Sequence, residues 1–433
     1  MLTDGGLKVP GPMVTLRSTI FNGIPSPRFI MATVDAQLED EPAVFSAGST
    51  WQLAALIALI ATQLRTLIVG VPPVLPELRA DLHLSFSATG ALTAIPVLGL
   101  GAAAIPGAIL VNRFGARRIV GAAMLGLGIA GALRLTPPMP YSLYFWTAVL
   151  SLSVALAQPG ITVLVRTWFP GRLQQVSTIY AMALGVGGLA GATLSVYLLE
   201  LGGWRGTFLI WSALALAMGI VWMWLAPGRG SAHVPAPHGL GRLMRDRQVW
   251  HVAALFGAQS LVFYGGITWI PFLLRGYSHN YLALVLFLFQ VTAIPMTAVL
   301  ATIRRPWARS RRWYVLGGLL MTAASIGFLS GATGLAWLWA PISGMGGAVM
   351  FAGALALPNL LAKTSADVAG YSALTLTAGY AFSFFGPILG GVLLDRTHVV
   401  TSPFWVITAS AMLAVVLGAT LPRAHETPAA VIT

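Results

Sequence analysis

The sequence predicts an all-α membrane protein with twelve transmembrane helices arranged as two six-helix halves. Of its 433 residues, 57% are hydrophobic and only 9% are charged, whereas soluble proteins have about 25% charged residues. Apolar stretches long enough to cross a hydrocarbon core of about 30 Å recur along the whole chain after an N-terminal region. The longest later polar interruption divides these stretches evenly. These observations predict the fold class.

The predicted spans follow one another with short connections. Each is an apolar stretch of roughly 20 residues. They cover residues 51–76, 86–111, 116–135, 142–166, 175–200, 204–226, 248–274, 281–303, 313–332, 335–361, 367–393 and 402–421. Residues 1–48 have several prolines and an acidic cluster but no helical period, and they predict a disordered cytoplasmic tail. Residues 422–433 predict a second, shorter cytoplasmic tail.

The polar segment 227–247 is predicted to be a cytoplasmic linker between an N half, 49–226, and a C half, 248–421. The tetrapeptide TAIP occurs at 93–96 and again at 292–295, and LPELR at 75–79 resembles IPFLLR at 270–275. Matches in the same order and at similar offsets indicate a duplicated six-helix unit. Parallel repeats of this kind are typical of secondary transporters, whose substrate site lies near the membrane midplane between the halves.

The positions of the basic residues predict the orientation. Most of the 25 Lys and Arg residues fall on the side of the membrane that also holds both termini. Cytoplasmic loops retain positive charge, so both termini are predicted to be cytoplasmic, in the plasma membrane or cell inner membrane. A smaller group falls at the outer ends, and Arg65 alone lies within the bilayer. The outer group is Arg79, Arg134, Arg205, Arg275 and Arg396.

The composition also excludes several kinds of site and partner. The net charge of +13 lies mostly in short runs between apolar spans, so it is interpreted as a topology signal and no nucleic-acid partner is expected. The chain has no cysteine, which excludes disulfides and cysteine-based metal sites. We expect no metal and no cofactor.

One loop resembles a known family. The sequence NRFGARR at 112–118, between the second and third predicted spans, is similar to the signature loop of the major facilitator superfamily. In that family an aspartate and several arginines latch the cytoplasmic ends of helices. Asn112 stands where the aspartate is usual, and Ala116 where one arginine is usual, which implies a weakened or replaced latch.

Longer segments resemble the cyanate and 2-nitroimidazole transporter family within that superfamily. They are QLRTLIVGVPPVLPELRADLHLS at 63–85, VRTWFPGRLQQVSTIYAMALGVGG at 165–188, GGWR at 202–205, QSLVFYGGITWIPFLL at 259–274 and LFLFQVTAIP at 286–295. The resemblance implies the major facilitator fold and transport of a small molecule. It also implies gating roles for the loop residues Asn112, Arg113, Gly115, Arg117 and Arg118.

Arg65 is the main functional candidate. It lies about 21 Å from Trp51 and about 16 Å from Pro76 along a helix, too far for its side chain to reach the membrane surface easily. No Asp or Glu lies in the interior of a predicted span to pair with it, because Glu77, Glu200, Asp367 and Asp395 all sit at span ends. We therefore expect Arg65 to face a water-filled cavity and to bind a small planar or carboxylate-like anion. The resembled family typically has an arginine at this place.

A structural role for Arg65 remains an alternative. Pro72 and Pro73 free the backbone carbonyls of Ile68 and Val69 one turn further along the helix, and these oxygens could satisfy the guanidinium. Against this, helical side chains lean toward the N-terminus, away from those carbonyls. The same prolines predict a bend on the outer side of Arg65, where that part of the helix could act as an outer gate.

Other polar side chains at similar depth complete the candidate site. Aligning Pro76 with Pro271 places Ser260 at the repeat position of Arg65, with Gln259 beside it and Tyr264 one turn on. For each neutral candidate the alternative is a hydrogen bond between helices with no role in binding. The predicted substrate-binding set is Arg65, Thr62, Gln158, Thr162, Tyr180, Gln259, Ser260, Tyr264, Gln290, Asn359 and Tyr380.

The predicted function is secondary active or facilitative transport of a small anion by alternating access. No embedded carboxylate is available for proton coupling. The chain also lacks HExxH and GxSxG motifs, so we expect no enzymatic activity. Multidrug efflux, for example of nitroimidazole-like compounds, and a transporter-like receptor remain alternatives. The expected partners are the solute and membrane lipid, and the expected state is a monomer.

Overall fold

The structure is a computed structural model that describes residues 47–102, 104–228, 240–303, 307–362 and 364–421. All of these belong to one compact unit, Val44–Thr433. Within the described ranges every regular element is a helix and no strand occurs. Of the predicted N-terminal tail 1–48, residues 1–46 lie outside the described residues, and the last two begin α2. The predicted tail 422–433 and linker residues 229–239 also lie outside the described residues.

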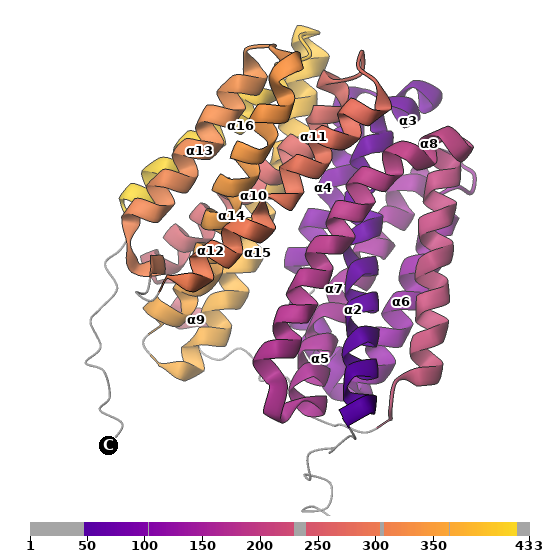
Figure 1. Ribbon diagram of the computed structural model, residues 1–433, viewed down its shortest axis with the longest axis vertical. Coiled ribbons are helices and arrows are strands. Elements are labelled where there is room, and N and C mark those ends of the chain that lie inside the picture. The colour runs from indigo at the N-terminus through magenta and orange to yellow at the C-terminus, as the bar shows by residue number, and fades with distance from the viewer. Residues whose placement is uncertain (1–46, 103, 229–239, 304–306, 363, 422–433) are drawn as a thin grey trace, which may run out of the picture. The chain divides into compact units, whose positions relative to one another are not determined.

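The helices of the N half follow one another along the chain and are joined by short connections (Figure 1). The first long helix ends where the tandem prolines begin, because proline has no N–H to continue the ladder. The elements are α2 (Ala47–Val69), the 3-10 turn η1 (Pro72–Val74), α3 (Leu75–Leu82), α4 (Phe86–Ala102), α5 (Ala104–Phe114), α6 (Ala116–Leu133), α7 (Tyr141–Trp168), η2 (Pro170–Arg172) and α8 (Leu173–Leu225).

The helices of the C half come after a short helix in the predicted linker, and they too are joined by short connections. The elements are α9 (Leu240–Leu243), α10 (Arg247–Leu273), α11 (His279–Val291), α12 (Ala293–Thr302), η3 (Trp307–Arg309), α13 (Arg311–Leu329), η4 (Thr333–Leu335), α14 (Ala336–Leu361), α15 (Ser365–Thr397) and α16 (Pro403–Ala419). The connections fall at two ends of the bundle. We call these the Asp395 end, where α3, α10 and α15 finish, and the Arg117 end, where α6 begins.

Helix α8 has 53 residues, which at 1.5 Å per residue is about 80 Å and far longer than one membrane crossing. It is interrupted where Gly202 and Gly203 leave helical geometry. Gly203 has φ of 61° and ψ of −166°, a conformation essentially restricted to glycine. A Cβ there would also lie 2.8 Å from the Glu77 carboxylate. The break falls at the predicted boundary between the fifth and sixth spans.

The all-helical membrane fold is confirmed, but the count of twelve spans is not. Among the described residues, nine helices are long and apolar enough to cross a membrane, or ten if the bent pair of α4 and α5 is one span. The undivided α8 counts once in that number, and α16, with 17 residues, is shorter than the other spans. The twelve-span arrangement therefore remains a prediction.

Packing inside the N half depends on close backbone approach. Helix α2 packs against α8, and a Cβ on Gly187 would lie 2.0 Å from the Thr62 carbonyl oxygen. A Cβ on Gly191, one helical turn further along α8, would lie 2.8 Å from the Thr66 carbonyl oxygen. Thr66 Oγ1 donates a hydrogen bond of 3.1 Å to the Gly187 carbonyl. Small residues at this interface are typical of helix packing in membranes, and they fix α2, which holds Arg65, against α8.

The two halves meet mainly through two helix pairs, α4 with α15 and α8 with α11. Figure 1 shows the indigo-to-magenta helices of the N half grouped beside the orange and yellow helices of the C half. At the Asp395 end the Asp395 carboxylate accepts hydrogen bonds from the backbone N–H groups of Phe86 and Ser87, at 2.7 and 2.8 Å. The carboxylate of one half therefore caps the first turn of α4 in the other half.

Candidate functional site

Arg65 lies in α2, and its side chain extends toward the C half. Its Nη1 donates a hydrogen bond of 3.1 Å to the Tyr264 hydroxyl of α10. Among the described residues, none of the ion pairs includes Arg65; the paired carboxylates are those of Asp81, Glu200 and Asp367. The guanidinium is half-buried. Arg65 is thus a cation held between the halves by a neutral hydroxyl.

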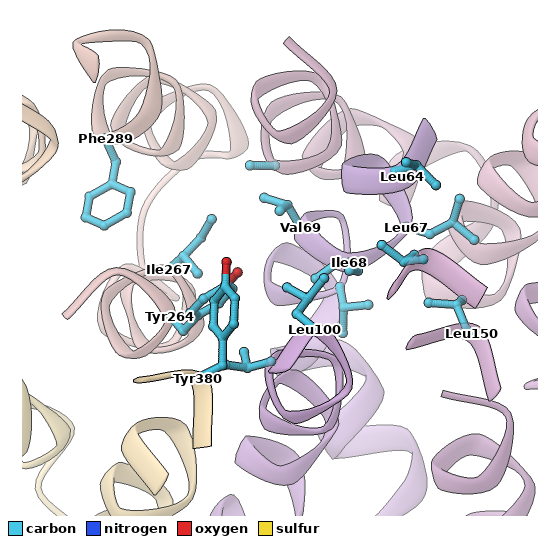
Figure 2. Packing of buried hydrophobic residues seen from close by; sticks show 14 of the residues in the cluster. Leu64, Leu67, Ile68, Val69, Leu100, Leu150, Tyr264, Ile267, Phe289 and Tyr380 are labelled. Atoms are coloured by element: carbon cyan, nitrogen blue, oxygen red, sulfur yellow. The ribbon is translucent and has the colours of Figure 1, made fainter. Parts of the chain in front are cut away.

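Two further tyrosines lie close enough to the guanidinium to interact with it electrostatically, Tyr380 of α15 and Tyr180 of α8. The rings of Tyr264 and Tyr380 have centroids 6.5 Å apart, and Figure 2 shows them side by side with both hydroxyls on the same side. A tyrosine hydroxyl that accepts a bond from arginine still has its own O–H to donate. The arrangement therefore offers both a cation and neutral donors to an anion.

Further aromatic rings pack against Tyr264 and Tyr380. Phe256 lies 5.0 Å from Tyr380, and Phe263 lies 5.1 Å from Tyr264, both edge to face, and Phe263 stacks on Phe289 at 5.7 Å. We call these five rings the aromatic wall: Phe256, Phe263, Tyr264, Phe289 and Tyr380. Sequence reasoning missed its phenylalanines, because a phenylalanine inside an apolar span resembles any other apolar residue of that span.

Gln290 also links the halves. Its Nε2 donates a hydrogen bond of 3.1 Å to the Gly188 carbonyl of α8. Gln259 and Ser260 are buried and bond to each other, Nε2 to Oγ, at 2.7 Å. Ser260, predicted as the counterpart of Arg65, is thus engaged with its neighbour, while Tyr264, one turn on, reaches the guanidinium.

The remaining candidates have no described contact with the Arg65 guanidinium, although Thr62 lies one helical turn before Arg65 on α2. Thr62 and Thr162 each donate to a carbonyl of their own helix, those of Leu59 and Gln158, at 2.7 and 3.1 Å. Gln158 is partly buried in α7, and Asn359 is exposed close to the end of α14. The contacts of the described residues join Tyr180, Tyr264 and Tyr380 to Arg65, and they join none of these four residues to it.

Comparisons with known proteins place the chain in a family. The model of the Major Facilitator Superfamily matches residues 53–383. The chain belongs to the major facilitator superfamily. It is 29% identical over 390 residues to the 2-nitroimidazole transporter of Escherichia coli (strain K12), covering 86% of this chain and 96% of that protein. It is 25% identical over 346 residues to the cyanate transport protein CynX of the same organism, covering 78% of this chain and 88% of that protein.

A solved structure shows the same fold. It is a bacterial homologue of the human lysosomal transporter Spinster in an inward-facing and occupied conformation, with a TM-score of 0.72 and 14% identity over 87% of this chain and 96% of that chain. The major facilitator protein described here is therefore a multi-pass membrane transporter and not an enzyme. Its described residues contain no group of three or more His, Cys, Asp or Glu side chains that could hold a metal ion.

The signature loop of this transporter is a single sharp turn. Gly115 separates α5 from α6 and has φ of 85°, which favours glycine. Arg117 donates from Nη2 to the Met223 carbonyl of α8 at 2.6 Å, and its own carbonyl accepts a bond from Trp222. The guanidinium of Arg113 lies over the Phe114 ring, at 5.2 Å, and Arg118 and Asn112 flank the turn. Arg117 thus ties two helices of the N half together.

The tandem prolines lie in the wall of the bundle. Pro72 and Pro73 are buried in η1, between α2 and α3. The Ile68 carbonyl accepts a long hydrogen bond from the Val71 N–H, at 3.4 Å. The hydrogen bond described for Arg65 goes to the Tyr264 hydroxyl and not to a backbone carbonyl freed by the prolines. At the prolines, where a bend on the outer side of Arg65 was predicted, the structure has a 3-10 turn between α2 and α3.

Proposed function

We propose that this transporter moves a small anion across the membrane by alternating access, as a secondary active or facilitative carrier, and that Arg65 binds the anion. The observation that carries the proposal is the Arg65 guanidinium between the two halves, bonded to Tyr264 and without a carboxylate partner among the described residues. An uncompensated cation in a low-dielectric cleft attracts an anion. Its planar fork suits a planar or carboxylate-like group.

The tyrosines support this reading. An anion at Arg65 would accept further hydrogen bonds from the hydroxyls of Tyr264 and Tyr380, and Tyr180 lies on the other side, in the N half. Contacts from both halves to one solute are what alternating access requires, because the solute must remain bound while the halves move. One relative is named a cyanate transport protein, which agrees with a small anion.

A second candidate solute is a flat nitroaromatic compound, as in multidrug efflux. The aromatic wall beside Arg65 favours it, because ring faces and edges stack on a planar ring. The two nitro oxygens would accept hydrogen bonds from the guanidinium in the same bidentate geometry as a carboxylate. The name of another relative, a 2-nitroimidazole transporter, agrees with this candidate. Cationic drugs are disfavoured, because Arg65 repels them.

We propose that the Asp395 end faces outward and the Arg117 end faces the cytoplasm of a cell inner or plasma membrane. Most of the described arginines fall toward the Arg117 end, and cytoplasmic loops retain positive charge. Both termini would then be cytoplasmic, and the protein would work as a monomer surrounded by lipid. Pro72 and Pro73 would allow the helix to bend at the outer gate. The loop from Asn112 to Arg118 would stabilise the contacts between helices on the cytoplasmic side.

Uptake and counterflow in proteoliposomes test the proposal, with cyanate, small carboxylates, 2-nitroimidazole and a cationic dye as solutes. Arg65→Gln should lower anion transport at least about tenfold, the effect of losing a charged hydrogen bond. Arg65→Lys should keep the charge but lose the fork, and so retain only part of the activity. Arg205→Gln, which changes an exposed arginine, is the matched control. Unchanged anion transport by folded Arg65→Gln protein would overturn the assignment.

A further inference from the structure

A pocket at the Arg117 end lies outside the transport site. It has a volume of about 410 Å³ and is formed by α9, the start of α10, the end of α14 and the start of α15. This volume is in the range of small-molecule sites. Its polar lining consists of Arg242, Arg245, Asp246, Arg247, Asp367 and Tyr371.

Both carboxylates of the pocket are already engaged. Asp367 is in contact with Arg242 and accepts a hydrogen bond of 2.8 Å from the Thr364 hydroxyl. Asp246 caps α10 by accepting the Gln248 N–H at 2.9 Å. A carboxylate at a helix N-terminus is stabilised by the helix dipole. Neither acidic group therefore needs a further cation from the pocket.

The other polar groups of the pocket have no such partner. No carboxylate of a described residue pairs with the exposed side chains of Arg245 and Arg247. Tyr371 is 1% exposed, and its hydroxyl has no hydrogen-bond partner among the described residues. Buried hydroxyls are nearly always hydrogen-bonded. An oxygen of a bound ligand would supply the missing acceptor.

The neighbouring residues place the pocket at the level of a membrane surface. Trp250 is 49% exposed and donates from Nε1 to the Met244 carbonyl at 2.7 Å, and Met244 is itself 51% exposed. Tryptophan with its N–H satisfied and its ring exposed is typical of the membrane interface. Phosphate groups of lipids lie at this level, and basic pockets between helices bind them.

We propose that this pocket binds a phosphate group, with Arg245 and Arg247 as the charged ligands and the Tyr371 hydroxyl as a neutral donor. The phosphate belongs either to the headgroup of an anionic phospholipid or to a free phosphate compound in solution. Helix α9 belongs to the predicted linker, α10 begins the C half, and α15 packs against α4 of the N half. A ligand in the pocket would therefore hold the linker and the C half together near the contact between the halves.

Binding to the purified full-length protein tests the proposal in two arms. The first measures phosphatidylglycerol binding to delipidated protein by native mass spectrometry. The second measures inorganic phosphate and glycerol phosphate binding by titration calorimetry. The double variant Arg245→Gln and Arg247→Gln should weaken binding at least about tenfold, as expected for lost charged hydrogen bonds. Tyr371→Phe, which keeps the ring, should weaken it severalfold.

The matched control is the double variant Arg309→Gln and Arg312→Gln, which removes the same charge from exposed positions near the start of α13. It should bind as the wild type does. Binding in the lipid arm alone identifies a headgroup, and binding in the solution arm identifies a free phosphate compound. The proposal is overturned if neither arm shows binding, or if the pocket variants and the control bind equally well.

Discussion

The contact between Arg65 and Tyr264 agrees with the predicted internal repeat. The two residues are 199 residues apart, the same offset that separates TAIP at 93–96 from TAIP at 292–295. Residues related by an approximate two-fold axis meet when both lie on that axis. The proline alignment used in the sequence prediction gave Ser260 instead, one helical turn away. The sequence could thus locate the counterpart of Arg65 to within one turn, but side-chain reach decided which residue makes the contact.

Tyr264→Phe tests what the hydroxyl contributes to the site. The variant keeps the ring but removes the acceptor that holds Nη1 of Arg65 at 3.1 Å. A hydrogen bond to a charged group is worth about 1.5–3 kcal/mol, so we expect the apparent affinity for the transported anion to fall about tenfold. The measurement is the KM of anion uptake in proteoliposomes.

The control for this change is Tyr277→Phe. That hydroxyl bonds Thr333 Oγ1 at 2.7 Å in an exposed position, far along the chain from Arg65. Its loss should leave the KM unchanged. If Tyr264→Phe also has the wild-type KM, then the hydroxyl does not position Arg65 for the anion.

Arg134 is a second buried cation and shows a limit of the sequence prediction. The sequence prediction placed it at an outer helix end, and in the structure the side chain is only 2% exposed. It lies over the Phe208 ring at 4.2 Å, and its Nε has no hydrogen-bond partner among the described residues. Hydropathy reports how far a residue is from a span end, but not how the neighbouring helices cover that end.

Arg134→Met is expected to leave the apparent unfolding temperature unchanged or to raise it. Burying a charge without a partner costs several kcal/mol, and cation–π stacking returns only about 2 kcal/mol. Methionine would fill the volume without this desolvation cost. Arg134→Lys keeps the charge but stacks less well, so its unfolding temperature should fall. Detergent-solubilised protein is heated and monitored by intrinsic fluorescence. A lower midpoint for Arg134→Met alone would mean that the charge has a stabilising partner.

At the scale of helices, apolar length and proline position predicted most boundaries. The first span was expected over 51–76 with a bend at the prolines, and the structure ends α2 at Val69 and continues it as η1 and α3. The break in α8 at Gly202 and Gly203 also falls between two predicted spans. The pairing of α4 with α15 and of α8 with α11 could not be predicted, because a hydropathy pattern contains no information on which helix faces meet.

The 3-10 turn after α2 should affect the rate of the transport cycle. Pro72→Ala and Pro73→Ala each restore a backbone N–H and allow α2 to extend as a continuous helix, which stiffens the proposed outer gate. We expect the maximal transport rate to fall severalfold while the KM stays unchanged, because neither proline contacts Arg65 through a described hydrogen bond.

Pro76→Ala is the control for this pair. Pro76 lies in the first turn of α3, where a missing N–H needs no partner, so alanine should have little effect. Rates and KM values come from initial uptake in proteoliposomes. A change in KM with an unchanged maximal rate would place the prolines in solute binding and not in gating.

At the scale of the whole transporter, the carboxylate contacts that the described residues make between the halves lie toward the Asp395 end. Asp395 caps α4, and His279 bonds Glu200 at 2.6 Å. Within the N half, the guanidinium of Arg79 lies 3.6 Å from the centre of the Phe86 ring, next to the same cap. In the proposed alternating-access cycle this end opens at some stage, so the contacts of Asp395 and Glu200, which join the halves, would break in each cycle. In the described arrangement these contacts hold the halves together at the Asp395 end.

Asp395→Asn is expected to shift the equilibrium toward the state open at that end. The amide can still accept one N–H, but it loses the charge that strengthens both bonds to the first turn of α4 and its favourable interaction with the helix dipole. A loss of about 1.4 kcal/mol changes a two-state ratio about tenfold. The chain has no cysteine, so spin labels at Ala80→Cys and Val399→Cys report the distance across this end without further changes. Both positions are exposed.

Asp81→Asn is the matched control for this experiment. It makes the same carboxylate-to-amide change at the same end, but Asp81 pairs with Arg205 at 2.7 Å inside the N half. Exposed ion pairs contribute little, and breaking one within a half has no reason to separate the halves. Pulsed electron spin resonance should show a larger long-distance population for Asp395→Asn only. Identical distance distributions for the wild type and both variants would mean that the cap on α4 is not what keeps this end closed.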